Sequence, residues 1–403
     1  MSVEILPSQK IKKYDIFAIL FLIIMTFQPL VEYFFRENSL IAIITFRLMF
    51  ALAIFSSLIM YTLGVRPIIN KYRIYFLFVF VINLSMTLIY IIFDYTRDYS
   101  NIGIYFAMLS GFFFAKVNIE IIRKTLKIIA LTGIILLPFI FLWFDFDISV
   151  ALRRGYTWTF SFFLTGFYWA VLPFIVLAIV YKKDKIVAVL YLLSAIILNL
   201  IFIKRAIFVD TAIVFSVYIL MLILYTKNSF KKLLQFLLLI AVLMLGLYLL
   251  LGDFLIELIH TVFSRFEQTA ENITTFDRFV ESMNYFKNAT FFEILLGKGF
   301  LGTHSGQGTI SNALHVGWSN FILKGGIFLL SVLVIPISCV PRLLLNYKKL
   351  PLKIQFSTLL MIIYFIRLFY VNLHSFLPDL LIFFYCVFNI MDYNATKIKG
   401  KKI

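Results

Sequence analysis

The sequence predicts an all-α polytopic membrane protein with about twelve transmembrane helices and one large extracytoplasmic loop. Of the 403 residues, 62% are hydrophobic and only 14% are charged, and the mean hydropathy of +0.99 lies well outside the range of soluble domains. Apolar runs of about 20 residues recur between short polar breaks. The one long exception, residues 253–318, is too polar to lie in a bilayer. Because the bilayer core holds no water, the backbone of each apolar run is expected to be helical.

The spans are expected at residues 15–35, 39–63, 74–93, 102–118, 126–144, 158–181, 186–203, 206–226, 233–252, 316–338, 354–372 and 376–392. The chain therefore divides into transmembrane helices 1–9 (1–252), an extracytoplasmic loop with an amphipathic helix (253–318), and helices 10–12 with a basic cytoplasmic tail (319–403). The basic start from Lys10 to Lys13 leads into an apolar run too long for a signal peptide, so no cleavable signal is expected.

The distribution of charge sets the orientation of these spans. The net charge of +17 comes from small clusters of lysine and arginine between spans, a pattern of membrane topology rather than of nucleic-acid binding. With a cytoplasmic N-terminus, most of the 37 basic residues lie inside, and only Arg47, Lys324 and Arg367 fall within spans. The positive-inside rule therefore places both termini in the cytoplasm and all four histidines on the outer side.

No metal or cofactor is expected. The two cysteines, Cys339 and Cys386, lie in apolar runs and cannot hold a zinc ion by themselves. His304 and His315 have no third ligand at a metal-binding spacing, and Glu37 is a lone carboxylate in the first outer loop.

Within the large loop, the sequence from Thr274 to Asp277 fits a capping box and predicts that a helix begins there. Arg278 then lies in the first turn, where free backbone N–H groups and the positive end of the dipole favour a phosphate. The alternative is a solvated face on which Arg278 pairs with Glu281. The periodicity separates an apolar face, Phe276, Phe279, Val280, Met283 and Phe286, from a polar one, Arg278, Glu281, Ser282 and Tyr285.

Three further features lie at the expected membrane surface. Gly297-Lys298-Gly299-Phe300 indicates a bent segment that can approach a ligand closely, or an interfacial loop without a site. His315, just before the tenth span, is either a structural histidine or an acid or base at membrane depth. Lys204-Arg205 opens the eighth span at the outer face, where the two cations either meet an anionic group or snorkel to lipid phosphates.

In this order and topology, the features resemble the bacterial O-antigen polymerase and O-antigen ligase superfamily. The shared features are the number of spans, the Lys204-Arg205 step, the arginine-bearing helix of a late outer loop, the run from Leu295 to Phe300 and the histidine before the next span. The chain departs from the family pattern in having valine after His315 and in having Lys204-Arg205-Ala206 where Ser-Arg-Gly is frequent.

The resemblance implies a metal-independent membrane glycosyltransferase of the bacterial inner membrane. It would polymerise undecaprenyl-pyrophosphate-linked oligosaccharide repeat units into O-antigen or capsular polysaccharide at the outer face. Arg205 and Arg278 would stabilise the diphosphate, and His315 would orient or deprotonate the acceptor hydroxyl. The implied partners are lipid-linked oligosaccharides, the bilayer, a chain-length regulator and a flippase, with no nucleic acid. Further substrate-binding cations would be Lys204, Lys298, Arg265, Arg153 and Arg154.

Two alternatives remain open. In the first, the acceptor is lipid A core and the chain is an O-antigen ligase of lipopolysaccharide synthesis. In the second, the chain is a lipid-linked oligosaccharide flippase, and Arg47, Lys324 and Arg367 line a cavity for an anionic head group. Against a transporter, we find no internal repeat, and the polar residues concentrate in one outer loop rather than at mid-membrane.

Overall fold

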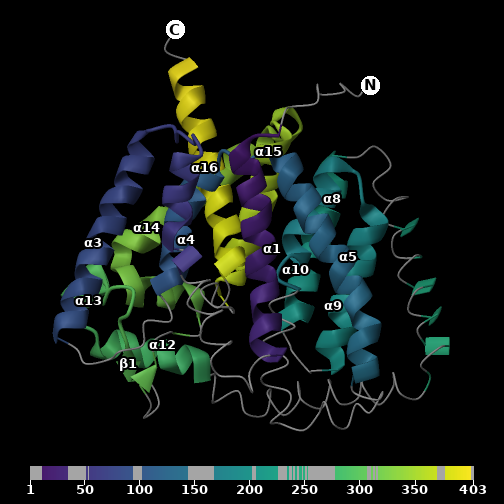
Figure 1. The fold of residues 1–403 in the computed structure, drawn as a ribbon, viewed down its shortest axis with the longest axis horizontal. Helices are drawn as coiled ribbons and strands as arrows, with labels where there is room; N and C mark the ends of the chain where they lie inside the picture. Colours follow the sequence, from purple (N-terminus) through teal and green to yellow (C-terminus); the bar gives the residue numbers. More distant parts are fainter. Residues whose placement is uncertain are drawn as a thin grey trace.

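The computed structural model describes residues 11–34, 51–52, 54–93, 102–143, 168–201, 206–225, 277–305, 310–311, 314, 316–369 and 377–400, with short pieces between 234 and 252. Figure 1 shows a bundle of helices in which α1 begins and α16 ends at one end, called here the terminal end. The helices α12 and α13 and the strand β1 lie at the opposite end, called here the loop end.

Most of the described helices run between these two ends, whereas α12 and α13 lie at the loop end. They are α1 (Lys13–Phe34), α3 (Lys71–Phe93), α4 (Ile102–Phe114), α5 (Ile119–Trp143), α8 (Val171–Tyr181), α9 (Lys185–Ile201), α10 (Ala206–Tyr225), α12 (Asp277–Asn288), α13 (Phe291–Leu296), α14 (Gly317–Leu345), α15 (Leu352–Arg367) and α16 (Leu377–Gly400). A 3-10 turn, η3 (Tyr347–Lys349), follows α14, and β1 (His304–Ser305) pairs antiparallel with β2 (Ile310–Ser311), with His304 opposite Ser311. The all-α prediction is therefore confirmed for the described part of the chain, apart from this short hairpin.

Most expected spans coincide with a described helix to within a few residues. The span expected at 126–144 begins earlier, at Ile119, because Glu120 and Arg123 pair with each other inside the first turns of α5. The span expected at 316–338 continues to Leu345 despite Pro336 and Pro341. Among the described residues, the helices Lys71–Phe93 and Gly317–Leu345 are long and apolar enough to cross a membrane. The total of about twelve spans stays a prediction.

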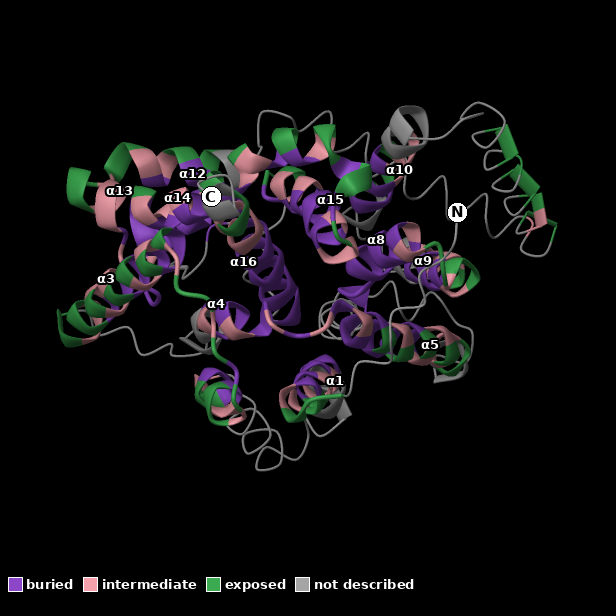
Figure 2. Cartoon of the chain, turned by 90° about the horizontal axis from the view of Figure 1, so that it is seen from above, coloured by how far each residue is buried: buried purple, intermediate pink, exposed green. Residues whose placement is uncertain are grey.

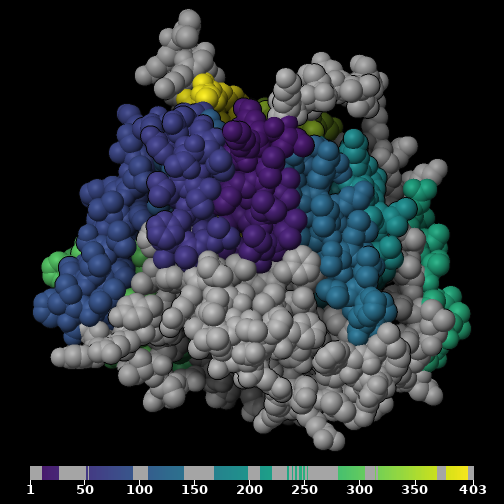
Figure 3. Space-filling model, viewed as in Figure 1, coloured from purple at the N-terminus to yellow at the C-terminus, as the bar shows by residue number. Residues whose placement is uncertain are grey.

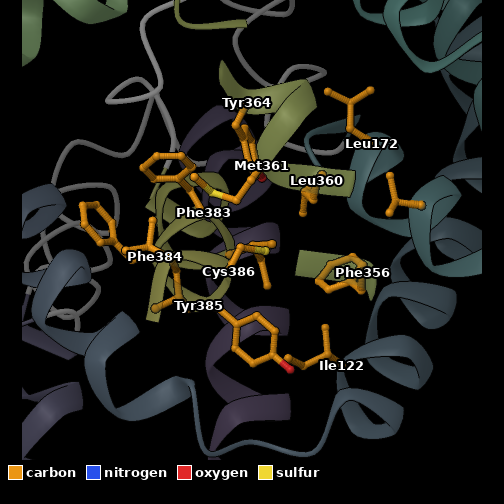
Figure 4. Close-up of a cluster of buried hydrophobic side chains, with 14 of the residues drawn as sticks. Ile122, Leu172, Phe356, Leu360, Met361, Tyr364, Phe383, Phe384, Tyr385 and Cys386 are labelled. Atoms are coloured by element: carbon orange, nitrogen blue, oxygen red, sulfur yellow. The ribbon is translucent and has the colours of Figure 1, made fainter. Parts of the chain in front are cut away.

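The helix α16 lies at the centre of the bundle. Every residue from Leu380 to Phe388 is fully buried, so this stretch of α16 has no outward face, as expected for a segment that is apolar all round. Gly111 lets α4 approach closely, because a Cβ there would lie 2.4 Å from the Cβ of Phe384. In Figure 4 the side chains of α16 interdigitate with those of α15, including Phe356, Leu360 and Met361.

Helices at the edge of the bundle turn apolar side chains outward. Figure 2 shows the purple, buried α16 at the centre and green positions along the outer sides of α3 and α5. Because water does not favour such continuous apolar stripes, this surface is typical of helices in contact with lipid. The outward residues recur at helical spacing: Ile74, Phe78, Val81, Leu88 and Ile92 on α3, and Ile128, Leu131, Ile135 and Phe139 on α5.

Buried ion pairs join helices at the terminal end. The guanidinium of Arg73, which is fully buried, donates to Asp392 at 2.9 and 2.7 Å and to the carbonyl oxygen of Phe112 at 2.7 Å. Asp184 accepts from Lys127 at 2.7 Å and also pairs with Arg123. The contacts of Arg73 thus join α3, α4 and α16, and those of Asp184 join α5 to the turn between α8 and α9.

Candidate functional site

The helix α12 turns its polar side toward the protein. Glu281, Ser282 and Tyr285 are only 7%, 4% and 5% exposed, whereas Val280 and Met283 are 41% and 56% exposed. The predicted separation of the two faces is confirmed for Val280 and Met283, whereas Phe286, predicted on the apolar face, is partly buried against Tyr285. The alternative of a solvated polar face is wrong for Glu281, which is buried. Polar groups are seldom buried without a partner, so an inward polar face indicates a polar interior contact or a ligand.

His304, on β1, lies against this inward face. Its Nε2 is 3.4 Å from Oε1 of Glu281, and its ring meets the ring of Tyr285 edge to face, with centroids 6.5 Å apart. His304 is itself 5% exposed. Burial raises the pKa of the Tyr285 phenol, so the hydroxyl keeps its proton, and it has no hydrogen-bond partner among the described residues. Glu281 and Tyr285 of α12 thus form a buried polar cluster with His304 of β1.

The short helix α13 follows α12 and begins with a capping box that we did not predict from the sequence. The Thr290 hydroxyl accepts from the Glu293 amide at 3.3 Å, and the Glu293 carboxylate accepts from the Thr290 amide at 2.8 Å. Glu293 also pairs with Lys298 at 3.1 Å. The signal was present as Thr-Phe-Phe-Glu, a threonine with a glutamate three residues later. Lys298, predicted to bind substrate, therefore contacts a carboxylate of its own loop.

We expect α13 to lose this capping as the medium is acidified. Burial favours the neutral form of Glu293, but the hydrogen bonds from Thr290 and the ion pair with Lys298 outweigh it and hold the pKa of the carboxyl below its ordinary value of 4.5. Because folding lowers this pKa, the ionised carboxylate stabilises the fold at pH values above 4.5. This stabilisation is lost as the pH falls through the lower pKa of the folded state. The protection of the α13 amides from hydrogen exchange, measured against an unstructured peptide at the same pH, should therefore fall with acidification in the wild type. In Glu293→Gln the protection should be low throughout and show no such step; an unchanged step in this variant would contradict the assignment.

The glycine-rich turn after α13, residues 297–302, packs between α3 and α14. The amide of Lys298 donates to the carbonyl of Leu323 at 2.8 Å, and the amide of Phe300 donates to the Thr87 hydroxyl at 2.7 Å. The Phe300 ring reaches Phe80, with centroids 5.5 Å apart. Thr87 lies six residues before the end of α3, roughly 9 Å along the helix axis. The turn therefore enters the bundle from the loop end.

Glycine is required at three positions of this contact. Gly297 and Gly299 have positive φ angles of 75° and 76°, and Gly326, inside α14, has φ 61°. A Cβ at Gly297 would lie 2.5 Å from the Gly325 amide nitrogen, and one at Gly326 would lie 2.2 Å from the Leu295 carbonyl oxygen. The backbones of α13 and α14 thus touch directly, and α14 is interrupted where they meet.

Two cations that the sequence places inside spans are engaged by the protein. Lys324, 1% exposed, donates its ammonium to the carbonyl of Gly302 at 2.8 Å. Arg367 contacts Asp210 at 2.9 Å and Asp379 at 2.5 Å, and the Tyr364 hydroxyl donates to Asp379 at 2.6 Å. These pairs explain how both charges are held among apolar helices. Arg47, the third such cation, lies outside the described residues.

The structure places the predicted catalytic residues only in part. Arg278 belongs to the first turn of α12, as expected, and backbone register puts it on the same side as Glu281, Ser282 and Tyr285. Next to His315, Leu314 is buried against Tyr285 and Leu323, and its amide donates to Asn320 at 3.0 Å. His315 itself, together with Arg205, Lys204, Arg265, Arg153 and Arg154, lies outside the described residues.

The residues that the sequence analysis did not select are Glu281 and His304 as a pair, Tyr285 as their neighbour, and Glu293 as the partner of Lys298. A spacing of three, four and seven residues from Arg278 was visible and marks one helix face, but it does not say which way that face turns. Comparisons with models of protein families, with curated proteins and with solved structures find no match.

Proposed function

We propose that this chain transfers an oligosaccharide from an undecaprenyl pyrophosphate carrier to an acceptor sugar, as a polysaccharide polymerase of the bacterial inner membrane. The single observation that carries the proposal is the inward polar face of α12, formed by Glu281, Ser282 and Tyr285. Arg278 belongs to the same helix, three residues before Glu281. This face is buried at the loop end, beside a turn that enters the bundle. A site at this depth suits a substrate whose diphosphate lies at the membrane surface and whose prenyl chain lies in the bilayer.

In the proposed reaction, an oxygen of the acceptor hydroxyl attacks the anomeric carbon of the donor. The bond between that carbon and the phosphate oxygen breaks, and undecaprenyl pyrophosphate leaves with the bonding electron pair. His315 takes the proton of the acceptor hydroxyl as general base. Arg278, at the N-terminus of α12, and Arg205 stabilise the charge that develops on the leaving diphosphate, because guanidinium groups match phosphate oxygens with two donors each.

The described contacts support different roles for the other polar side chains near α12 and α13. The ion pair of Lys298 with Glu293 suits a role in fixing α13 to the glycine turn, ahead of the substrate-binding role inferred from the sequence. The contact of His304 with Glu281 holds α12 against β1 and thereby positions the helix that carries Arg278. The buried, unpartnered hydroxyl of Tyr285, judged among the described residues, offers a donor to a sugar or phosphate oxygen.

The rival functions differ in what is made. In vesicles that contain the purified chain and a lipid-linked repeat unit, a polymerase lengthens the glycan, a ligase does so only when lipid A core is added, and a flippase moves the substrate without forming a bond. The contacts of Lys324 with Gly302 and of Arg367 with two aspartates disfavour a free cationic cavity between the helices. We expect chain growth without lipid A core; transbilayer movement with an unchanged glycan would refute the proposal.

We expect polymerisation to survive chelation of divalent ions. The proposal assigns the charge of the leaving diphosphate to two guanidinium groups, so no step depends on a metal. Polymer formation by the purified protein should therefore be the same with and without EDTA. Loss of turnover in EDTA that magnesium or manganese restores would contradict this assignment of charge stabilisation.

We also expect the loop end to face outward. Asn288 and Lys183 are both exposed, and they lie near opposite ends of the bundle, at the end of α12 and between α8 and α9. In intact cells, a cysteine at position 288 should react with an impermeant thiol reagent, whereas one at position 183 should react only after the membrane is opened. The reverse pattern would overturn the orientation that the positive-inside rule assigns.

A further inference from the structure

The outward surface of α12 and α13 is apolar. Phe291 and Phe292 are 72% and 69% exposed, and their rings contact each other with centroids 5.8 Å apart. On the preceding helix, Val280 and Met283 are 41% and 56% exposed. These four residues are called here the apolar loop surface. Large apolar side chains gathered on a surface segment, above a buried polar face, are the reverse of what water favours and indicate contact with another apolar phase.

The position of α13 along the bundle identifies that phase. The carbonyl of Leu295 lies against Gly326, which is nine residues, or roughly 14 Å, into α14 from its beginning at Gly317. The turn after α13 reaches Thr87, roughly 9 Å below the end of α3. Both of these helices are long and apolar enough to cross a membrane. The far end of α13 therefore lies below the ends of two candidate spans, and Phe291 and Phe292 begin the same short helix.

The apolar loop surface also lies beside the outward apolar stripe of α3. Near its end, α3 exposes Leu88, Ile89, Ile92 and Phe93, between 48% and 79% of each side chain. The helix α13 packs against α14 and contacts α3. In Figure 3 the green surface of this region emerges beside α3 at the margin of the molecule. Lipid that covers the end of α3 would thus reach α13 without a break.

We propose that the apolar loop surface inserts into the lipid leaflet at the loop end and fixes the depth of α12. The occupant is the bilayer rather than a second protein, because the surface continues the apolar side of a candidate span. If α12 lies between the bundle and the lipid, its polar face turns inward to the protein and its apolar face turns outward to the lipid. This proposal holds whether or not the chain forms glycosidic bonds.

The test measures the depth of single spin labels in the full chain. Cys339 and Cys386 are replaced by serine and alanine, and single cysteines are placed at Phe291, Phe292, Val280 and Met283. Leu88→Cys serves as the lipid-facing control and Lys183→Cys as the water-facing control, since both sites are exposed. The labelled proteins are reconstituted in vesicles of phosphatidylethanolamine and phosphatidylglycerol. Collisions with oxygen, which concentrates in lipid, are compared with collisions with a water-soluble nickel complex.

We expect the labels at 291 and 292 to collide more often with oxygen than with nickel, as at position 88, and the labels at 280 and 283 to show the same preference. Preference for nickel at these positions, as at 183, would overturn the proposal by showing a surface in water. Protection from both reagents would overturn it as well, by showing a partner protein or a second copy on the surface. Labelled proteins that elute from a sizing column with the unlabelled background report on the native fold, and four independent positions protect the test against a single misfolded variant.

Discussion

Replacing Arg278 with alanine is expected to abolish most polymer formation while leaving the amount of protein in the membrane near that of the wild type. Arg278 lies in the first turn of α12, and in the proposed reaction the helix dipole and the guanidinium would act together on the leaving diphosphate. Removal of one donor that stabilises transition-state charge typically lowers turnover about 10²–10³-fold. Arg278→Lys should fail almost as badly, because an ammonium keeps the charge but loses the two-pronged geometry.

The same helix offers a matched control for this experiment. Lys287 is an exposed cation on the last turn of α12, away from the inward polar face, so Lys287→Ala should keep most of the polymer. Arg205→Ala should lose activity as Arg278→Ala does, and the double variant should be little worse than the worse single one, since residues that act on one group are not additive. His315→Ala should lower turnover while donor binding is kept. Polymer of normal length and yield from Arg278→Ala would remove Arg278 from the site.

The second large effect is expected at the contact between α13 and α14. Gly297→Ala and Gly326→Ala should each lower the thermal midpoint and the yield of the protein. A left-handed backbone with a Cβ costs about 1–2 kcal/mol, and forcing extra atoms into a packed contact adds about 1–3 kcal/mol. At Gly297 the added atom would lie 2.5 Å from the backbone of Lys324 and Gly325, and at Gly326 it would overlap Leu295.

The variant Gly64→Ala distinguishes the cost of the left-handed backbone from the cost of steric overlap. It has φ 90°, but a Cβ there would meet nothing within 4 Å, so Gly64→Ala pays the backbone cost without the overlap. Thermal midpoints of the three variants, measured by the fraction that still elutes as a sharp peak after heating, should therefore fall furthest for Gly297→Ala and Gly326→Ala. Equal midpoints for all three variants would mean that α13 and α14 do not touch through their backbones.

The sequence predicts the helices well because apolar runs and polar breaks determine them. The expected span 74–93 differs from α3 only at its first turn, and the expected span 206–226 matches α10 closely. The capping pattern near Thr274 also places the start of a loop helix that is described from Asp277. Such features depend on neighbours within one or two turns, so a single sequence carries them.

The direction in which α12 turns could not be predicted in this way. Periodicity separates Val280 and Met283 from Glu281 and Tyr285, and in a soluble protein the apolar side would be buried. Here the bundle offers partners such as His304 to the polar side, and we propose that lipid covers the apolar side. The contact of Phe300 with Thr87 joins parts of the chain that are far apart in sequence, and the contact of Lys324 with Gly302 joins an expected span to the expected loop. No local sequence pattern indicates either pair.

We propose that the inward face of α12 serves the departure of a prenyl diphosphate, and measuring both products of the reaction tests this role. Purified wild-type protein is supplied with a lipid-linked repeat unit, and released undecaprenyl pyrophosphate is measured together with the length of the glycan. We expect one molecule of undecaprenyl pyrophosphate for each new bond, with both products lost in Arg278→Ala and kept in Lys287→Ala. Release without chain growth, transport without release, or full activity of Arg278→Ala would contradict it.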